Sequence, residues 1–213
     1  MKSLLASLLP LTLLAQQAPP RLLYVYRDSL KQGVDSAYEV IENAGAQACA
    51  DFRCPNPYLA IESLTGHHEA WWINAFATDA DTTGVVAAYA ANRPLADALR
   101  AVATRKEPLI GRPIEGFARY RPDLSRGPAW SVRGARFMVV LVTRAHHPVD
   151  GSVWEAADST LYVLRPMKTR LEAQELAQTL GARVFAIRPQ WSMPAPDWIA
   201  ADPEFWGSAP APK

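Results

Sequence analysis

The chain has 213 residues, of which 49% are hydrophobic and 20% charged, and its formal net charge at pH 7 is +1. This balance is typical of a globular protein and excludes a disordered chain. Because no block of basic residues is present, the composition predicts neither a nucleic-acid partner nor an anionic membrane surface as a partner.

Residues 1–18 have the layout of a secretory signal peptide. Lys2 provides a positive start, an apolar run extends from Ser3 to Ala15, and the small residues Ala15 and Ala18 suit cleavage by a signal peptidase. The run is too short to span a bilayer, and no later apolar stretch is long enough. We therefore expect a periplasmic or secreted mature protein with no membrane association after cleavage.

The next elements are a strand and a helix. Residues 21–30 contain β-branched and aromatic residues and have apolar character on both faces, which favours a strand that ends before Gly33. Ser36 and Glu39 have the spacing of a capping box at a helix start. The predicted apolar face of this helix then recurs every three or four residues, at Ala37, Ile41, Ala44, Ala48 and Phe52. Pro55 and Pro57 end the helix.

Cys49 and Cys54 lie where this helix is expected to end. In an oxidising compartment they form either a disulfide or a pair of buried thiols. Five residues apart is too far for a bridge on a continuous helix, so a disulfide requires the helix to end between them. The spacing is not C-x-x-C, which argues against a redox role.

The rest of the first half predicts two strands over 58–64 and 70–77, a helical region over 82–105 interrupted at Pro94, and a strand over 115–120. The first half therefore has the order β-α-β-β-α-β. Residues 121–128, rich in Arg, Pro and Gly, are predicted to be a linker.

The second half repeats this order without its first helix. Strands are predicted over 135–144, 153–156, 159–165 and 183–188, and a helix over 171–180 ends at Gly181. The remaining residues, 191–213, are rich in proline and tryptophan and show no periodicity. We expect them to wrap over the surface as an irregular segment.

The order β-α-β-β-α-β is the split ferredoxin-like plan, whose antiparallel sheet leaves one face to be covered by a second sheet. We therefore predict an α+β fold of two ferredoxin-like halves, complete over 21–125 and reduced over 133–190, whose antiparallel sheets pack as an α/β barrel. Residues 21–125 resemble the dimeric α/β-barrel superfamily, which includes NIPSNAP-like proteins and antibiotic-biosynthesis-type monooxygenases. The strand LLYVYRDSL, the strands YLAIES and AWWINAF, and the Pro-split helix carry this resemblance.

Candidate ligand-binding residues are polar or aromatic side chains in apolar strands: Tyr26, Glu62, Trp72, Asn74 and Arg119. An Asn among apolar neighbours needs a hydrogen-bond partner. The resemblance implies that Trp72 and Asn74 lie on the inner barrel wall and contact a substrate. The alternative is a structural hydrogen bond from Asn74 to Glu62 or Tyr26. Arg119 either binds an anionic ligand or pairs with an exposed carboxylate.

The four histidines form two adjacent pairs, His67–His68 and His146–His147, each after a predicted strand. If the halves bring both pairs together, they would supply ligands for zinc or haem iron. The alternative is four solvated loop histidines.

No motif of a hydrolase, a nucleotide-binding protein or a zinc protease is present. We therefore expect an exported protein without catalysis that binds a small apolar molecule or a protein partner, with self-association as a further option and no cofactor. The alternatives are a cofactor-independent, monooxygenase-like oxidoreductase and a His-ligated metal or haem protein.

Overall fold

A computed structural model describes residues 19–128 and 130–212. The predicted signal peptide, residues 1–18, lies outside these residues. The main helices and strands are β1 (Leu22–Ser29), α1 (Asp35–Asp51), β2 (Tyr58–Ser63), β3 (Glu69–Phe76), α2 (Asp79–Ala91), α3 (Arg93–Lys106), β4 (Ile114–Tyr120), β5 (Ser125–Arg126), β6 (Phe137–Thr143), β7 (Val149–Asp150), β8 (Ser152–Ala156), β9 (Leu161–Met167), α4 (Arg170–Leu180), β10 (Arg183–Ile187), α5 (Pro196–Ala201) and α6 (Pro203–Trp206).

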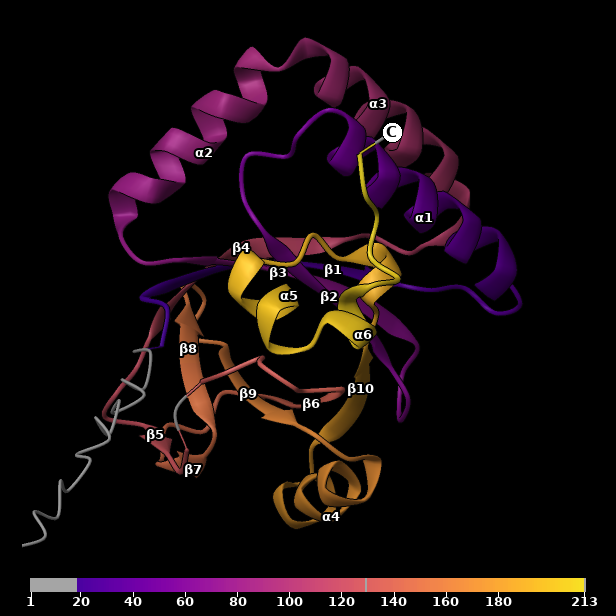
Figure 1. Cartoon of the computed structure of the whole chain (residues 1–213). Coiled ribbons are helices and arrows are strands. Elements are labelled where there is room, and N and C mark those ends of the chain that lie inside the picture. Colours follow the sequence, from indigo (N-terminus) through magenta and orange to yellow (C-terminus); the bar gives the residue numbers. More distant parts are fainter. Residues whose placement is uncertain (1–18, 129, 213) are drawn as a thin grey trace, which may run out of the picture.

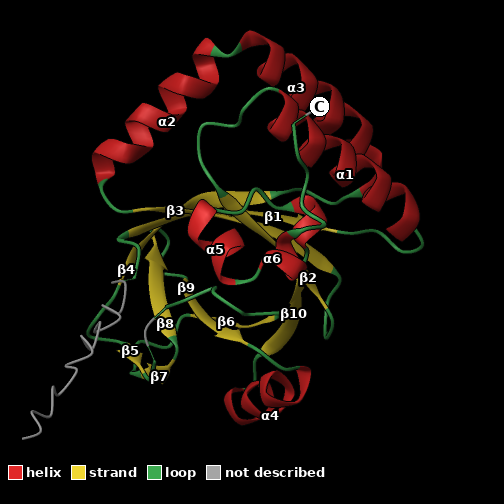
Figure 2. Ribbon diagram, viewed as in Figure 1, coloured by secondary structure: helices red, strands yellow, loops and turns green. Residues whose placement is uncertain are grey.

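Eight strands form a closed antiparallel barrel in the order β1-β3-β2-β10-β6-β9-β8-β4 (Figure 2). Each half contributes one four-stranded sheet, β4-β1-β3-β2 and β8-β9-β6-β10. The two sheets join edge to edge through β2–β10 and β4–β8. This confirms the predicted α+β fold with antiparallel sheets in a barrel. Edge pairing leaves no strand edge of the eight open to solvent, which a simple stack of two sheets would not achieve.

Side chains fill the interior of the barrel. Leu23 and Val25 of β1 and Trp71 and Ile73 of β3 belong to one buried apolar cluster, together with Phe185 of β10. Because side chains alternate across a strand, the neighbouring residues of β1 and β3 point outward. The barrel interior is therefore a core, and the outer face of β1 and β3 carries a second set of side chains beneath the helices.

Helices α1, α2 and α3 arch over the outer face of β1, β3 and β4, and α4 lies on the opposite side of the barrel (Figure 1). The predicted break of the second helix is confirmed, because α2 ends at Ala91 and α3 begins at Arg93 with Pro94 in its first turn. The Asn92 side chain accepts a hydrogen bond from the Leu95 amide and caps α3. The break lets the two helices cover different parts of the sheet.

The predicted start of α1 is wrong, and its predicted apolar face is wrong at both ends, although Ile41 in the middle is buried. The helix begins at Asp35 without a side-chain cap, so Ser36 and Glu39 form no capping box. Tyr38 is fully buried, whereas Ala37 is exposed and Phe52 is 41% exposed. Tyr38 is buried because its hydroxyl donates a 2.8 Å hydrogen bond to the buried Asp28 carboxylate. The spacing of apolar residues cannot predict such a polar contact.

In the second half, an irregular segment occupies the place of the absent helix. Leu124 of the predicted linker packs on the outward side chains Val153, Leu161 and Val163. Strands β5 and β7 form a short parallel pair beside them. The predicted cap of α4 at Gly181 is confirmed by its left-handed φ of 64°, which favours glycine.

The expectation of an irregular surface tail is wrong. The tail contains α5 and α6, which lie in front of the barrel in Figure 1. Trp191 and Trp206 are 1% and 3% exposed, and Trp206 joins the apolar cluster of the barrel interior. The proline-rich composition conceals this packing because each helix is a single short segment begun by a proline.

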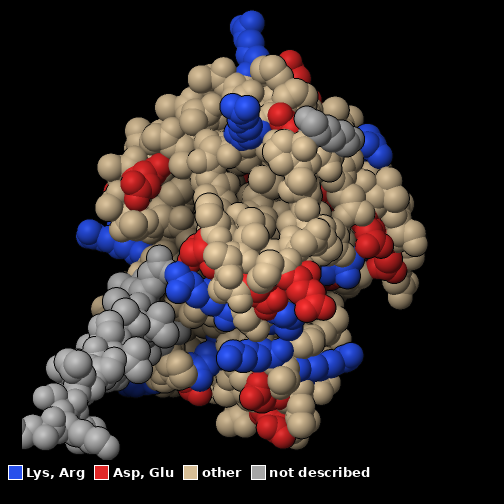
Figure 3. Space-filling model, in the orientation of Figure 1, with Lys and Arg blue, Asp and Glu red and all other residues tan. Residues whose placement is uncertain are grey.

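Charged side chains of both signs lie next to one another across the middle and lower part of the face drawn in Figure 3. Within the described residues, no helix has the length and apolar character needed to cross a bilayer.

Candidate functional site

A cavity of about 510 Å³ lies between the outer face of the sheet and the helices α1, α2 and α3. This volume is in the range of small-molecule sites. Its walls are mostly apolar and aromatic, and the lining residues are Tyr24, Tyr26, Glu42, Gly45, Ala46, Cys49, Asn56, Tyr58, Trp72, Asn74, Phe76, Thr82, Val85, Val86, Tyr89, Leu99, Val102, Ala103, Lys106 and Phe117.

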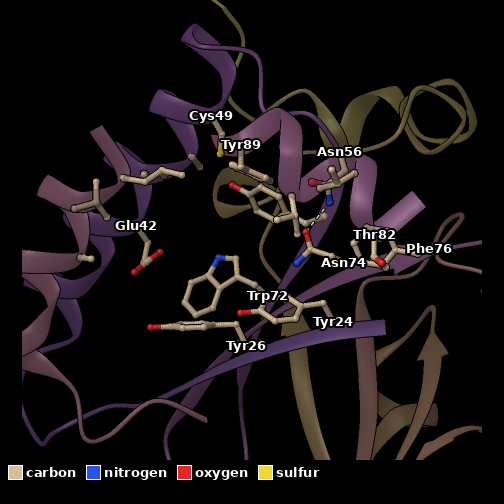
Figure 4. Close-up of a pocket in the computed structure, with 18 of the residues that line it drawn as sticks. Tyr24, Tyr26, Glu42, Cys49, Asn56, Trp72, Asn74, Phe76, Thr82 and Tyr89 are labelled. Atoms are coloured by element: carbon tan, nitrogen blue, oxygen red, sulfur yellow. Dashed lines mark hydrogen bonds between the residues drawn. The ribbon is translucent and has the colours of Figure 1, made fainter. Parts of the chain in front are cut away.

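The aromatic wall follows from strand alternation. Tyr24 and Tyr26 of β1 and Trp72 of β3 point outward, so they lie side by side beneath the helices (Figure 4). The rings of Tyr26 and Trp72 meet edge to face at 5.7 Å, and those of Tyr24 and Phe117 are 5.1 Å apart. The tyrosine hydroxyls give this apolar wall polar tips.

An amide pair and a disulfide shape the upper end of the cavity. Asn56 donates a 2.7 Å hydrogen bond from Nδ2 to Oδ1 of Asn74 (Figure 4). Cys49 and Cys54 form a disulfide, and α1 ends at Asp51, between them. The Tyr89 hydroxyl contacts Cys54 Sγ at 3.4 Å. The bridge thus holds the loop that carries Asn56 against the end of α1.

We expect removal of this bridge to cost about 2 kcal/mol, because it closes a short loop and so constrains the unfolded chain only modestly. The double variant Cys49→Ala/Cys54→Ala should lower the free energy of unfolding in urea by that amount at neutral pH. Adding a reductant to the wild type should have the same effect, and none on the variant. A loss below about 0.5 kcal/mol would contradict this expectation.

A buried charge cluster closes the other end of the cavity. The Lys106 ammonium lies 2.8 Å from Asp28 and 3.1 Å from Glu42. It also lies 4.6 Å above the Trp72 ring and 5.0 Å above that of Tyr26, in cation–π geometry. Asp28 is fully buried, and Glu42 and Lys106 are 5% and 8% exposed. Two carboxylates therefore share one ammonium away from water.

Burial raises the pKa of Glu42 to about 7, and the nearby Lys106 ammonium offsets this only in part. Burial by itself lowers the pKa of Lys106, but Glu42 and Asp28 outweigh it, so this pKa lies above its ordinary value. Lys106 therefore stays protonated, whereas Glu42 can exchange a proton near neutral pH.

Glu42→Gln is expected to remove part of the pH dependence of stability. Because the pKa of Glu42 is about 7 in the folded protein and 4.5 ordinarily, the folded state binds this proton more tightly. The resulting stabilisation is complete below about pH 4.5 and is lost as pH rises through about 7, by roughly 1–3 kcal/mol. Urea unfolding across this range should show that fall in the wild type and a flatter curve in Glu42→Gln. The exposed control Glu175→Gln, on α4, should keep the wild-type slope.

Three of the five predicted ligand-binding residues, Tyr26, Trp72 and Asn74, line the cavity. They do so on the outer face of the sheet, so the implied place on the inner barrel wall is wrong. The expected partner of Asn74 is also different, because Asn56 bonds to it and neither Glu62 nor Tyr26 does so. The physical reason is register: odd-numbered residues of β3 fill the interior, and even-numbered residues face the helices.

The other two predicted residues do not line the cavity. Glu62 lies 3.1 Å from His68 and 3.5 Å from Arg188. Arg119 forms an exposed ion pair with Asp79 at 2.8 Å. Both therefore make ion pairs away from the cavity.

The histidines make local contacts. His67 contacts Ser29 at 2.8 Å, His68 lies between Glu62 and Asp35, and His146 is 3.9 Å from Glu155. Among residues 19–128 and 130–212, no three His, Cys, Asp or Glu side chains are placed to hold a metal. His146 and His147 thus do not join His67 and His68 in one ligand set.

The residues of the site that sequence reasoning missed include its charged and amide side chains Asp28, Glu42, Asn56 and Lys106. One signal was available for Asp28. It lies two residues after Tyr26 in the same strand, so the two side chains must lie on the same face of the sheet. A buried carboxylate requires a partner of opposite charge, so a cation is expected nearby, but the sequence does not show which residue provides it.

No protein-family model matches the chain, and none of the curated proteins matches it. Among solved structures, a putative monooxygenase from Fusobacterium nucleatum has a TM-score of 0.47 at 9% identity, over 83% of this chain and 94% of that one. A putative monooxygenase from Lactobacillus acidophilus has a TM-score of 0.43 at 10% identity, over 79% of this chain and 93% of that one. A mutant chlorite dismutase from Candidatus Nitrospira defluvii, in complex with cyanide, has a TM-score of 0.40 at 8% identity, over 79% of this chain and 92% of that one.

Proposed function

We propose that this protein is an exported binding protein of the dimeric α/β-barrel type, which holds a small, largely apolar molecule between β1, β3 and the helices α1–α3. The observation that supports this best is the cavity of about 510 Å³, which has aromatic walls and a few polar groups at its two ends. Such a combination is typical of a small-molecule site. The ligand lies beside the barrel, because side chains fill the barrel itself.

Titration with the neutral fluorescent probe phenylnaphthylamine tests this proposal. Ala103 lines the cavity from α3, whereas Ala101 lies on the same helix and does not line it. Ala103→Trp should weaken probe binding about tenfold or more, because the larger side chain takes up ligand volume, and Ala101→Trp should not. Equal affinities in the two variants, or no binding to the wild type, would contradict the proposal. Native mass spectrometry of protein from its source would then identify a retained molecule.

Export is the second part of the proposal and rests on the layout of residues 1–18. Sequencing the N-terminus of the mature protein tests it. We expect the mature chain to begin between Gln16 and Pro19, and an intact Met1 in the mature protein would contradict export through a cleaved signal.

A second candidate function is a cofactor-independent, monooxygenase-like oxidoreductase. One observation favours it: Trp72, Asn74 and Glu42 line the same cavity, so an aromatic substrate could stack beside a carboxylate that exchanges protons near neutral pH. Oxidation of an acidic methylene group to a carbonyl consumes one O₂ and releases one water, so it requires no external reductant.

Oxygen uptake with anthrone, an aromatic ketone with an acidic methylene group, separates the two candidates. An oxidoreductase should consume oxygen, and Asn74→Ala should abolish turnover with a nearly unchanged Tm. If Asn74→Ala mainly lowers Tm, its hydrogen bond with Asn56 is structural. Binding without oxygen uptake would support the binding protein.

A further inference from the structure

Two residues that line the cavity carry buried acceptor atoms that are not fully used. Within the described residues, Oδ1 of Asn56 has no hydrogen-bond donor, and the neighbour of Oε1 of Glu42 is the Lys106 ammonium at 3.1 Å, which Glu42 shares with Asp28. Glu42 and Asn56 are 5% and 8% exposed, so water reaches neither freely. A buried acceptor without a donor costs free energy. A ligand that completes this site must therefore donate hydrogen bonds.

The charges around Glu42 point in the same direction. Asp28 from β1 and Lys106 from α3 are the charged groups packed against it, and Tyr26, Tyr38 and Tyr58 are the neighbouring titratable groups. The tyrosines are uncharged, because burial raises their pKa values. Two carboxylates against one ammonium leave an excess of one negative charge when Glu42 is ionised. A second cation would balance it.

The walls suit a cation as well. The faces of Trp72 and Tyr26 already take the Lys106 ammonium, and further rings, including Tyr24 and Tyr58, line the same cavity. Aromatic faces attract a desolvated cation through their quadrupoles. Figure 4 shows the Glu42 carboxylate turned toward the space beside Trp72. An organic cation there would meet both a carboxylate and aromatic rings.

We propose that the ligand is a lipophilic amine, whose protonated nitrogen binds Glu42 and whose apolar body fills the aromatic part of the cavity. The charges would then alternate from Asp28 through Lys106 and Glu42 to the ligand ammonium. This inference rests on the proposed binding function and specifies the chemical class of its ligand.

Three probes of similar shape and different charge test the inference: naphthylmethylamine, naphthalenemethanol and naphthoate. Their affinities for the exported mature protein are measured by calorimetry at about pH 8, where Glu42 is mainly ionised. We expect the amine to bind at least about tenfold more tightly than the alcohol, because both can donate a hydrogen bond to the Glu42 carboxylate but only the ammonium adds an ion pair. Naphthoate should bind most weakly.

Glu42→Gln tests whether the charge of Glu42, rather than the shape of the cavity, causes the preference for the amine. In this variant the amine should lose its advantage over the alcohol, while measurable binding of the alcohol shows that the cavity is intact. The exposed control Glu175→Gln on α4 should retain the full preference. Amine binding to the wild type should also weaken as pH falls below about 7, as Glu42 takes up a proton.

The outcomes distinguish a failure of the amine proposal from a failure of the proposed binding function. If the alcohol binds as well as the amine, or if naphthoate binds best, the ligand is not an amine although the cavity binds ligands. If none of the three probes binds, both the inference and the proposed binding function are wrong.

Discussion

Lys106→Met is expected to lower the free energy of unfolding by about 3–5 kcal/mol at neutral pH. The substitution keeps most of the side-chain volume and removes the ammonium that lies between two buried carboxylates, Asp28 and Glu42. Breaking a buried ion pair in this way leaves uncompensated charge, which accounts for an effect of that size. Urea denaturation followed by tryptophan fluorescence measures it. The exposed neighbour Arg105, changed to Met, should shift stability by less than about 0.5 kcal/mol.

A combined variant identifies charge as the cause. Adding Asp28→Asn and Glu42→Gln to Lys106→Met removes all three charges together and should recover a large part of the loss. If the combined variant is as unstable as the sum of its parts, lost packing of the lysine stem on Trp72 and Tyr26 is the better explanation.

Trp206→Ala is expected to cost about 3–5 kcal/mol, although the residue lies seven positions before the end of a proline-rich tail. Its side chain is 3% exposed and belongs to the cluster that fills the barrel, so truncation leaves a cavity in the core. Ile199→Ala on α5 is the control, because Ile199 is 42% exposed and should lose less than about 1 kcal/mol.

Thermal unfolding and urea denaturation should agree for both tail variants. Trp206→Phe should fall between the wild type and Trp206→Ala, since it restores part of the buried aromatic surface. Equal stabilities of Trp206→Ala and Ile199→Ala would mean that α6 adds nothing to the barrel core.

The order of strands and helices could be predicted from sequence because it depends on local patterns. Apolar strands, the proline at the start of α3 and the glycine that ends α4 each act within a few residues. The same patterns predicted two halves of related plan and therefore an antiparallel barrel, which the strand order confirms. They also identified Tyr26, Trp72 and Asn74 as unusual side chains, and the structure places all three in one cavity.

The side of the sheet on which those residues lie could not be predicted. Strand alternation separates Trp71 from Trp72, but it does not say which of them faces the interior. The face of α1 was likewise decided by polar contacts: Tyr38 bonds to Asp28 on the preceding strand, and Glu42 pairs with Lys106, which lies far away in the chain.

The sequence by itself thus determined the order of the barrel strands and of the helices between them, the antiparallel α+β class and the candidate aromatic residues, because short-range periodicity and turn chemistry specify them. The tertiary structure alone decided three things: that the sheets close edge to edge, that the tail packs into the core, and that Lys106 meets two carboxylates beside the cavity. Each of these depends on contacts between distant segments. Such contacts form because burying a charge or an apolar surface requires a partner, and no local pattern names that partner.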